Sequence, residues 1–424
     1  MSTQTSVHSA QKLAPRDWKF PVVYGVLAFI ALAAFGLAAE GGRNATFQLG
    51  QQGDFFHIPN ITVDAKTTGI VMGLLLAVLA GLSFWGQLKR ITIGNWLPVA
   101  VGVLFVIAFL AWSGAGSGVI PATALLAGAL ALSVPLIFGA MCGLVGERAG
   151  IINIAIEGQL LAGAFVAAVV ASLVGSPYAG LVAAPIGGVL VAIVLVFFAV
   201  RYWVDQIIIG VVLNVLVIGL TSFFFSTVLS DNPEQWNRSM RLPALPVPVL
   251  SDIPIIGPVL FNQNILVYLM YILVAVLQIA LFNSKWGLRL RAIGEHPRAA
   301  DTVGINVNRG RVLNTIMAGA IAGLGGAFFT VGSGLAFGKE MTAGQGYIAL
   351  AAMILGKWNP RGALMAALLF GFAKNLGNSL SAIGSPIPPD LLLMLPYIVT
   401  IFAVAGFVGK VRAPAAEGVP YSKQ

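Results

Sequence analysis

Charge-poor apolar runs of about 20 residues recur along this chain from residue 20 onward. A helix of about 20 apolar residues crosses the hydrocarbon core of a bilayer, and only helices or closed barrels satisfy all their backbone polar groups there. The sequence therefore predicts an all-α polytopic membrane protein with about 10–12 transmembrane helices, including short or broken ones. The expected spans lie near 20–39, 69–86, 97–111, 119–142, 158–175, 178–200, 206–229, 264–282, 312–332, 346–358 (short), 362–380 and 391–409.

The composition excludes several classes of protein. Only 9% of the residues are charged, against about 25% in an ordinary soluble domain. The 24 Lys and Arg are scattered between apolar runs rather than gathered on a face, which argues against a nucleic-acid partner. The single cysteine and the three histidines form no metal-ligand or nucleophile pattern within a span. We expect no catalytic residue, no metal site and no enzymatic activity in this chain.

Basic residues in short loops predict the orientation, because Lys and Arg are retained on the cytoplasmic side. They collect in a tail at 1–19, in the 87–96 turn, in a loop at 283–311 and in a tail at 410–424. We expect these segments in the cytoplasm, with a transmembrane domain over 20–409 between the two tails. The loops at 40–66 and 230–263 are net negative and are expected outside. The second is rich in proline, which breaks helices and central strands, so an ordered cap or an extended excursion is expected.

A glycine-punctuated stretch at 143–159 lies at membrane depth or its edge. Irregular backbone is tolerated there only when protein or a water-filled cavity covers it. Asn153 and Glu157 would share one face of a helical turn, and a charge in a span calls for a polar partner or a hydrated route. One interpretation is a broken helix that lines a translocation path. The other is a cytoplasmic turn with Glu147 and Arg148 exposed and Glu157 capping the next helix.

Further polar side chains lie inside the spans. Asn214 and Asn314 each occur within one, and Lys374, Asn375 and Asn378 are three and four residues apart on a third. They could line a polar path or form hydrogen bonds between helices.

Small residues and short runs mark other features of the packing. The run at 346–358 is too short for a full crossing and predicts a short or re-entrant helix that ends in a tight turn at Asn359-Pro360. Glycines allow helices to approach closely in lipid, and we expect a packing face at Gly319, Gly323, Gly325 and Gly326.

The loop at 283–311 is unusually long for a bare connector. Pro297 is a favourable first residue and Gly304 a favourable stop for a short helix, so a helix that docks on a cytoplasmic partner is predicted. An ordinary positive-inside loop is the alternative.

These motifs carry a family resemblance. Ala299-Ala300, followed four residues later by Gly304, matches the coupling-loop signature of bacterial ABC importer permeases. The segments 147–158, 287–305 and 346–372 resemble the nucleoside and simple-sugar branch of the branched-chain amino acid permease family. The resemblance runs from about residue 120 to 409, and the first 118 residues match only loosely. Arg298 stands where the signature usually has Glu, and Lys374 stands where related chains have an acidic residue.

The resemblance implies the permease subunit of an ATP-driven importer in the bacterial inner membrane. It implies nucleosides as cargo, with ribose-like sugars as the alternative. The implied partners are an ABC ATPase, a second permease that is identical or homologous, an extracytoplasmic substrate-binding protein and the lipid bilayer. The chain itself would bind no cofactor, and ATP would be used by the partner. The implied contact with the ATPase comprises Gly294, Glu295, His296, Pro297, Arg298, Ala299, Ala300, Asp301 and Gly304.

Two other hypotheses are an ion-coupled transporter and an intramembrane enzyme, and each requires residues that an ABC importer permease does not. The closest approach to a phosphate-binding loop, at 334–340, has the wrong spacing and lacks the hydroxyl residue. A self-contained ion-coupled transporter would need paired ionisable residues in the spans, whereas Glu157 and Lys374 have no obvious partner in the sequence. An intramembrane enzyme would need a nucleophile with a base or a metal cluster.

Overall fold

The computed structural model describes residues 18–422, apart from 51–53, 57, 92, 95, 117–118, 385–387, 389–390, 392–393, 395–396 and 398–411. The chain forms two compact units. Unit 1 comprises residues 1–49, 59–122 and 380–388, and unit 2 comprises 50–58, 123–379 and 389–424.

Unit 1 packs three helices beside a small sheet. The helices are α1 (Lys19–Ile30), which continues as the π-helical η1 (Ala31–Leu37), α2 (Ala65–Lys89) and α3 (Trp96–Ser113). The sheet has the order β2-β1-β3, from β1 (Asn44–Gln48), β2 (Ile61–Asp64) and β3 (Ile120–Pro121). Asp64 caps α2 by accepting hydrogen bonds from the backbone N–H and the hydroxyl of Thr67. These bonds hold the pKa of the Asp64 carboxyl below its usual value.

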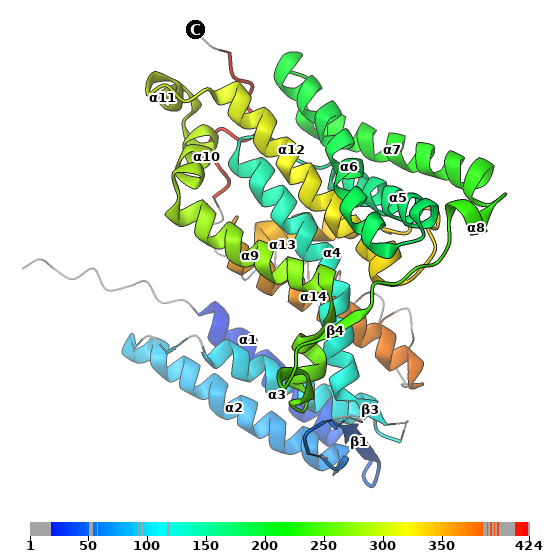
Figure 1. The fold of residues 1–424 in the computed structure, drawn as a ribbon. Coiled ribbons are helices and arrows are strands. Elements are labelled where there is room, and N and C mark those ends of the chain that lie inside the picture. The colour runs from blue at the N-terminus through cyan, green and yellow to red at the C-terminus, as the bar shows by residue number, and fades with distance from the viewer. Residues whose placement is uncertain are drawn as a thin grey trace, which may run out of the picture. The chain divides into compact units, whose positions relative to one another are not determined.

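The helices from α4 onward build unit 2 (Figure 1). They are α4 (Ala122–Arg148), α5 (Ile156–Val174), α6 (Pro177–Val196) with η2 (Phe197–Arg201), α7 (Gln206–Phe224) with η3 (Phe225–Leu229), α8 (Pro233–Trp236), α9 (Ile265–Asn283), α10 (Lys285–Glu295), α11 (Pro297–Thr302), α12 (Val307–Gly326) with η6 (Phe328–Gly332), α13 (Gln345–Leu355) and α14 (Pro360–Ala382).

Close packing of α5, α6 and α12 forms the centre of unit 2. A methyl group at Gly188 of α6 would lie 2.0 Å from the carbonyl oxygen of Gly319 on α12. One at Gly326 would lie 2.1 Å from the carbonyl oxygen of Leu160 on α5, and one at Gly163 would lie 2.3 Å from that of Gly323. The predicted glycine face on α12 is therefore confirmed as a packing surface, because only glycine permits such backbone contact.

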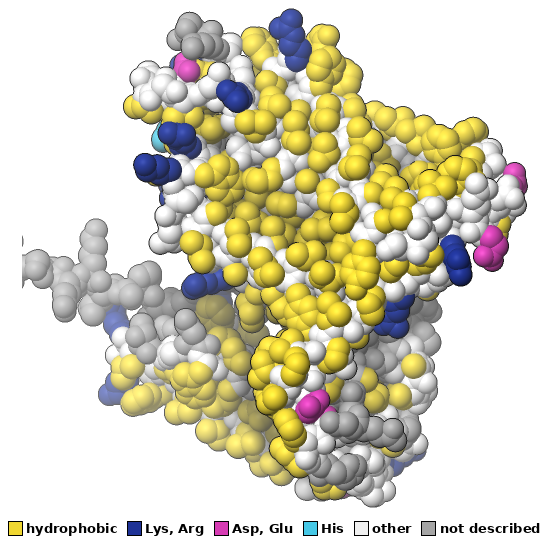
Figure 2. All heavy atoms as spheres, in the orientation of Figure 1, with side chains coloured by type: hydrophobic (Ala, Val, Ile, Leu, Met, Phe, Trp, Pro, Cys, Tyr) yellow, Lys and Arg dark blue, Asp and Glu magenta, His cyan; other side chains and the backbone are white. Residues whose placement is uncertain are grey.

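The predicted spans are confirmed over most of the chain. Within the described residues, nine helices are long and apolar enough to cross a membrane. They correspond to the first nine expected spans, and α13 and α14 correspond to the short span and to 362–380. The expected span at 391–409 lies largely outside the described residues. Figure 2 shows apolar side chains over most of the visible helical surface of unit 2, with Lys and Arg side chains gathered near α10 and α11.

The proline-rich loop at 230–263 is ordered without a long helix, as predicted. It contains α8, the strands β4 (Ala244–Pro246) and β5 (Asn262–Asn264), which pair antiparallel, and the short helices η4 (Leu250–Asp252) and η5 (Gly257–Phe261). Asn237 exchanges two hydrogen bonds with the backbone of Phe337, at 2.9 and 2.7 Å. This contact fastens the loop to the segment that precedes α13.

Candidate functional site: a broken helix and a coupling helix

The chain is non-helical between α4 and α5. Helix α4 ends at Arg148, Gly150 has a left-handed φ of +87°, and α5 begins only at Ile156. Asn214 on α7 closes the break from the side. Its amide nitrogen donates to the carbonyl oxygen of Ile154 at 3.0 Å, and its amide oxygen accepts from the N–H of Gly158 at 2.8 Å. The backbone polar groups around the break are thus paired by protein, as membrane depth requires.

Glu157 caps a helix that is distant in sequence. Its carboxylate accepts hydrogen bonds from the hydroxyl of Thr342 at 2.6 Å and from the N–H groups of Gly344 at 2.8 Å and Gly346 at 2.6 Å. The side chain is only 5% exposed. Because these donors form the N-terminus of α13, the helix dipole favours the negative charge. One interpretation of the sequence has Glu157 capping the next helix along the chain, which is α5; its carboxylate instead caps α13.

Other polar groups surround this carboxylate. The side chain of Gln345, the first residue of α13, is 6% exposed, and its amide oxygen is buried without a hydrogen-bond partner. The hydroxyl of Tyr347 accepts a hydrogen bond from Asn214 at 3.0 Å, while 47% of the residue is exposed. Lys374 on α14 is half-buried and interacts electrostatically with Glu157. We call Glu157, Asn214, Gln345, Tyr347 and Lys374 the polar cluster.

Asn153 belongs to a separate network, and the predicted shared face with Glu157 is wrong. Asn153 lies in the non-helical segment, so the spacing of four residues places the two side chains on no common helical turn. The amide nitrogen of Asn153 donates to the side-chain oxygen of Gln159 at 3.0 Å and to the sulfur of Cys142 at 3.2 Å. The glycine at 150 ends the helix too early for the periodicity to apply.

The remaining polar residues predicted for the pathway lie outside the polar cluster. Asn314 accepts a hydrogen bond from the indole of Trp286 at 3.0 Å and so joins α12 to α10. Asn375 donates to the carbonyl oxygen of Leu125 at 2.7 Å and joins α14 to α4. Asn378 is exposed. These contacts match the alternative of hydrogen bonds between helices.

The cytoplasmic loop predicted at 283–311 is folded into α10, α11 and the start of α12. Pro297 is the first residue of α11, and Gly304 follows the helix with a φ of +85°, as predicted. Arg298 and Ala299 are exposed, whereas Ala300 packs in a small apolar cluster. Figure 1 shows α11 at the edge of unit 2.

Some of the residues predicted to contact the ATPase also make contacts within this chain. Gly294 is buried against the end of α4, because a methyl group there would lie 2.3 Å from the carbonyl oxygen of Arg148. Glu295 lies 3.9 Å from the guanidinium of Arg148. Arg148 also donates to the carbonyl oxygen of Trp358 at 2.9 Å, and the Trp358 indole donates to Glu147 at 2.6 Å. The alternative in which Glu147 is exposed is therefore wrong, since its side chain is buried.

Several residues of these sites escaped the sequence analysis. Thr342, Gln345 and Tyr347 have ordinary polar side chains near the start of a short apolar run, and nothing in their spacing links them to Glu157. Val303, beside α11, is 75% exposed. An apolar residue next to the predicted docking helix was the one feature of the sequence that could have indicated a contact surface there. A single exposed apolar side chain is weak evidence, because contact surfaces are marked by patches of them.

Comparison with known proteins agrees with the family resemblance seen in the sequence. The family described as "Branched-chain amino acid transport system / permease component" matches residues 125–404. The chain is 37% identical over 319 residues to the guanosine ABC transporter permease protein NupQ of Bacillus subtilis, covering 72% of this chain and 96% of the relative. It is 38% identical over 312 residues to the nucleoside ABC transporter permease protein NupC of Lactococcus lactis, covering 70% and 96%. No solved structure matches.

The matched region begins close to the start of unit 2 and contains the break, α11, α13 and the polar cluster. This chain belongs to the branched-chain amino acid transport system permease family.

Proposed function

We propose that this chain is the membrane-spanning permease subunit of an ATP-driven ABC importer that carries nucleosides across the bacterial inner membrane. The observation that carries the proposal is the identity of 37 and 38% to permeases named for guanosine and nucleosides, over 96% of each relative. A relative at 31% identity, a putative glucose ABC transporter permease of Haloferax volcanii, makes simple sugars the second candidate.

The polar cluster suits a neutral, hydrogen-bonding substrate with an aromatic base. The ring of Tyr347 is half-exposed and can pack against a base. The unpartnered amide oxygen of Gln345 offers a hydrogen-bond acceptor. Glu157 is engaged by the α13 N-terminus, so substrate that touches this region meets a helix whose start is fixed. We infer that the cluster borders the translocation route, with Lys374 as its cationic edge.

We place the energy source in a separate ATPase that docks on α11. ATP is used by that partner, and this chain binds no cofactor. Because Gly294 of α10 contacts the end of α4 directly, movement of α11 would be passed to the break and so to the polar cluster. A second permease would complete the route, an extracytoplasmic protein would deliver the substrate, and both termini of this chain would lie in the cytoplasm.

The test uses the complete complex, purified through this subunit and reconstituted in liposomes that enclose ATP. We expect ATP-dependent uptake of labelled guanosine. Arg298→Glu and Gly304→Pro should lower uptake at least tenfold relative to ATP hydrolysis, because proline cannot adopt the positive φ at residue 304. Arg201→Glu, a charge reversal at the exposed end of η2, is the matched control and should transport normally. Normal uptake in both α11 variants would refute docking there.

Two further arms separate the alternatives. Excess unlabelled guanosine should compete with the label, and excess ribose or glucose should not; the reverse would assign the importer to sugars. Uptake that persists without ATP and follows a proton or sodium gradient would instead assign the chain to the ion-coupled transporters.

A further inference from the structure

Residues 413–421 pack onto unit 2. We call residues 413–421 the C-terminal strap; they lie in unit 2 and contain one turn at 415–418. The N–H of Ala416 donates to the carbonyl oxygen of Gly294 at 2.8 Å, and the N–H of Gly418 donates to that of Gly150 at 3.2 Å. The strap is thus hydrogen-bonded to α10 and to the break between α4 and α5 at the same time. Figure 1 shows this end of the chain beside α10 and α12.

The side chain of Arg311 forms hydrogen bonds with the strap. Its side chain on α12 is 2% exposed, and its guanidinium donates to the carbonyl oxygens of Val419 at 2.7 Å and Ala416 at 3.4 Å. A planar guanidinium can bond two acceptors at once. The group also lies under Gly150, where a methyl group would be 2.9 Å from its terminal nitrogen. Because a buried arginine donates its hydrogen bonds to the strap, it fixes the position of the strap on α12.

Glycine permits the approach from both sides. Gly150 and Gly418 have φ values of +87° and +73°, a region that favours glycine. A methyl group at Gly418 would lie 2.8 Å from the side chain of Ile152. The strap and the break are thus in backbone contact, without intervening side chains.

Side chains extend the contact to the remaining elements. Tyr421 packs against the cluster of Ile293, Ala300 and Val307, which joins α10, α11 and α12. The Glu417 side chain lies beside Glu147, whose carboxylate accepts a hydrogen bond from the Trp358 indole at the α13–α14 turn. Burial raises the pKa of the Glu417 carboxyl.

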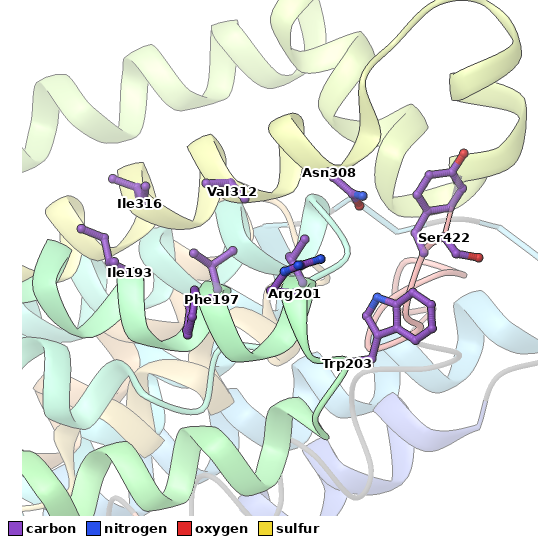
Figure 3. A pocket seen from close by; sticks show the side chains of 11 residues that line it. Ile193, Phe197, Arg201, Trp203, Asn308, Val312, Ile316 and Ser422 are labelled. Atoms are coloured by element: carbon purple, nitrogen blue, oxygen red, sulfur yellow. The ribbon is translucent and has the colours of Figure 1, made fainter. Parts of the chain in front are cut away.

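The fastened part of the strap ends at Tyr421. Tyr421 and the next residue, Ser422, line a groove of about 490 Å³ together with η2 and the first turns of α12. Figure 3 shows Arg201, Trp203 and Asn308 around the same end of the groove. The hydrogen bonds that hold the strap are therefore made with residues 150, 294, 295 and 311.

We propose that the C-terminal strap is a positioning element for transport, which ties the ATPase-docking helices α10 and α11 to the break before Glu157 and the polar cluster. Arg311 is the positioning residue that holds it. The inference rests on the proposed function, because α11 is taken as the docking helix. Without the strap, α11 keeps its own contacts with α10 and α12 but pulls less directly on residues 150–155.

The experiment measures how many ATP molecules the complete complex hydrolyses per guanosine transported. One variant has a stop codon after Arg412, which removes the strap. The other is Arg311→Lys, which keeps the positive charge but loses the planar guanidinium that bonds two carbonyl oxygens at once. We expect the ATPase to co-purify with both, and the ratio to rise at least fivefold on truncation and by a smaller factor in Arg311→Lys. Arg412→Met removes an exposed arginine just before the strap and should leave the ratio unchanged. An unchanged ratio in the truncated chain and in Arg311→Lys would overturn the proposal.

Amide hydrogen exchange on the same complexes measures, independently of transport, how well the strap protects the segments that it contacts. Removing the strap should speed exchange at residues 148–155 and 294–304, with no change in α5 or α6. Equal exchange with and without the strap would overturn the proposal even if the truncated chain transports poorly. If the unaltered complex does not take up guanosine with ATP, the proposed function fails, and exchange still decides whether the strap holds these segments.

Discussion

Glu157 places a carboxyl group inside a span, and the hydrogen-bond donors around it account for its position. A carboxylate at the centre of a bilayer costs about 2.5–3.5 kcal/mol on insertion scales, while a hydrogen bond to a charged group contributes about 1.5–3 kcal/mol. Three such bonds reach Glu157, two of them from the first backbone N–H groups of α13. The cost of the charge is thus offset by a helix terminus, so Glu157 requires no arginine or lysine in direct contact.

Replacing this carboxylate should therefore uncouple α13 from α5. Glu157→Gln removes the charge and turns an amide group toward the N–H donors of α13, leaving at least one of them unpaired. We expect a destabilisation of about 2–4 kcal/mol, with uptake lowered more than tenfold. Thermal unfolding of the purified complex in detergent measures the first effect. Glu340→Gln changes an exposed acid in the loop before α13 and should have neither effect; equal stability of both variants would contradict a capping role.

At this scale, the sequence indicated which residue was unusual but did not identify its partners. Glu157 was recognisable because a charge in an apolar run needs compensation. Its partners at 342–346 are separated from it by the seven α-helices α6 to α12, and no periodicity connects them. Asn153 was paired with Glu157 on helical spacing, and that prediction failed because the left-handed backbone at Gly150 ends α4 first.

Among the elements, α5, α6 and α12 depend on glycine for their close packing. Gly188→Ala would place a methyl group 2.0 Å from a carbonyl oxygen of α12, so the helices must separate. Overpacking of this kind costs about 1–3 kcal/mol or more, and we expect a lower thermal midpoint and reduced yield of the complex. Gly219→Ala on α7 is the matched change, since a methyl group there meets nothing within 4 Å. It should be neutral or stabilise the helix by about 0.5–1 kcal/mol.

The number and placement of the spans could be predicted, because lipid permits few alternatives. Helices are the only open structures that pair all their backbone groups in a bilayer, so apolar length predicted α1 to α7, α9, α12, α13 and α14 within a few residues. Proline and glycine positions likewise gave the bounds of α11. The division into two units could not be predicted, since it depends on which helices pack together and every span has a similar apolar composition.

For the whole molecule, the basic loops predict the side of the membrane on which each segment lies. We expect Glu234→Cys, in the loop at 230–263, to react with a membrane-impermeant maleimide in intact spheroplasts. Lys285→Cys, at the start of α10, should react only after the membrane is permeabilised, because positive loops stay in the cytoplasm. Both residues are exposed, and the native Cys142 is buried. Labelling in the opposite pattern would invert the orientation and remove α11 from the side where ATP is found.

The glycine contacts between α6 and α12 also have a consequence for how the protein is made. Gly188 must meet Gly319, which is synthesised about 130 residues later; at 5–20 residues per second the ribosome needs on the order of ten seconds for that distance. During this interval α5 and α6 can pair as a hairpin in the membrane, while the notch that receives α12 stays open to lipid or to the insertion machinery. Translation speed between these two helices is therefore a determinant of how much protein assembles correctly.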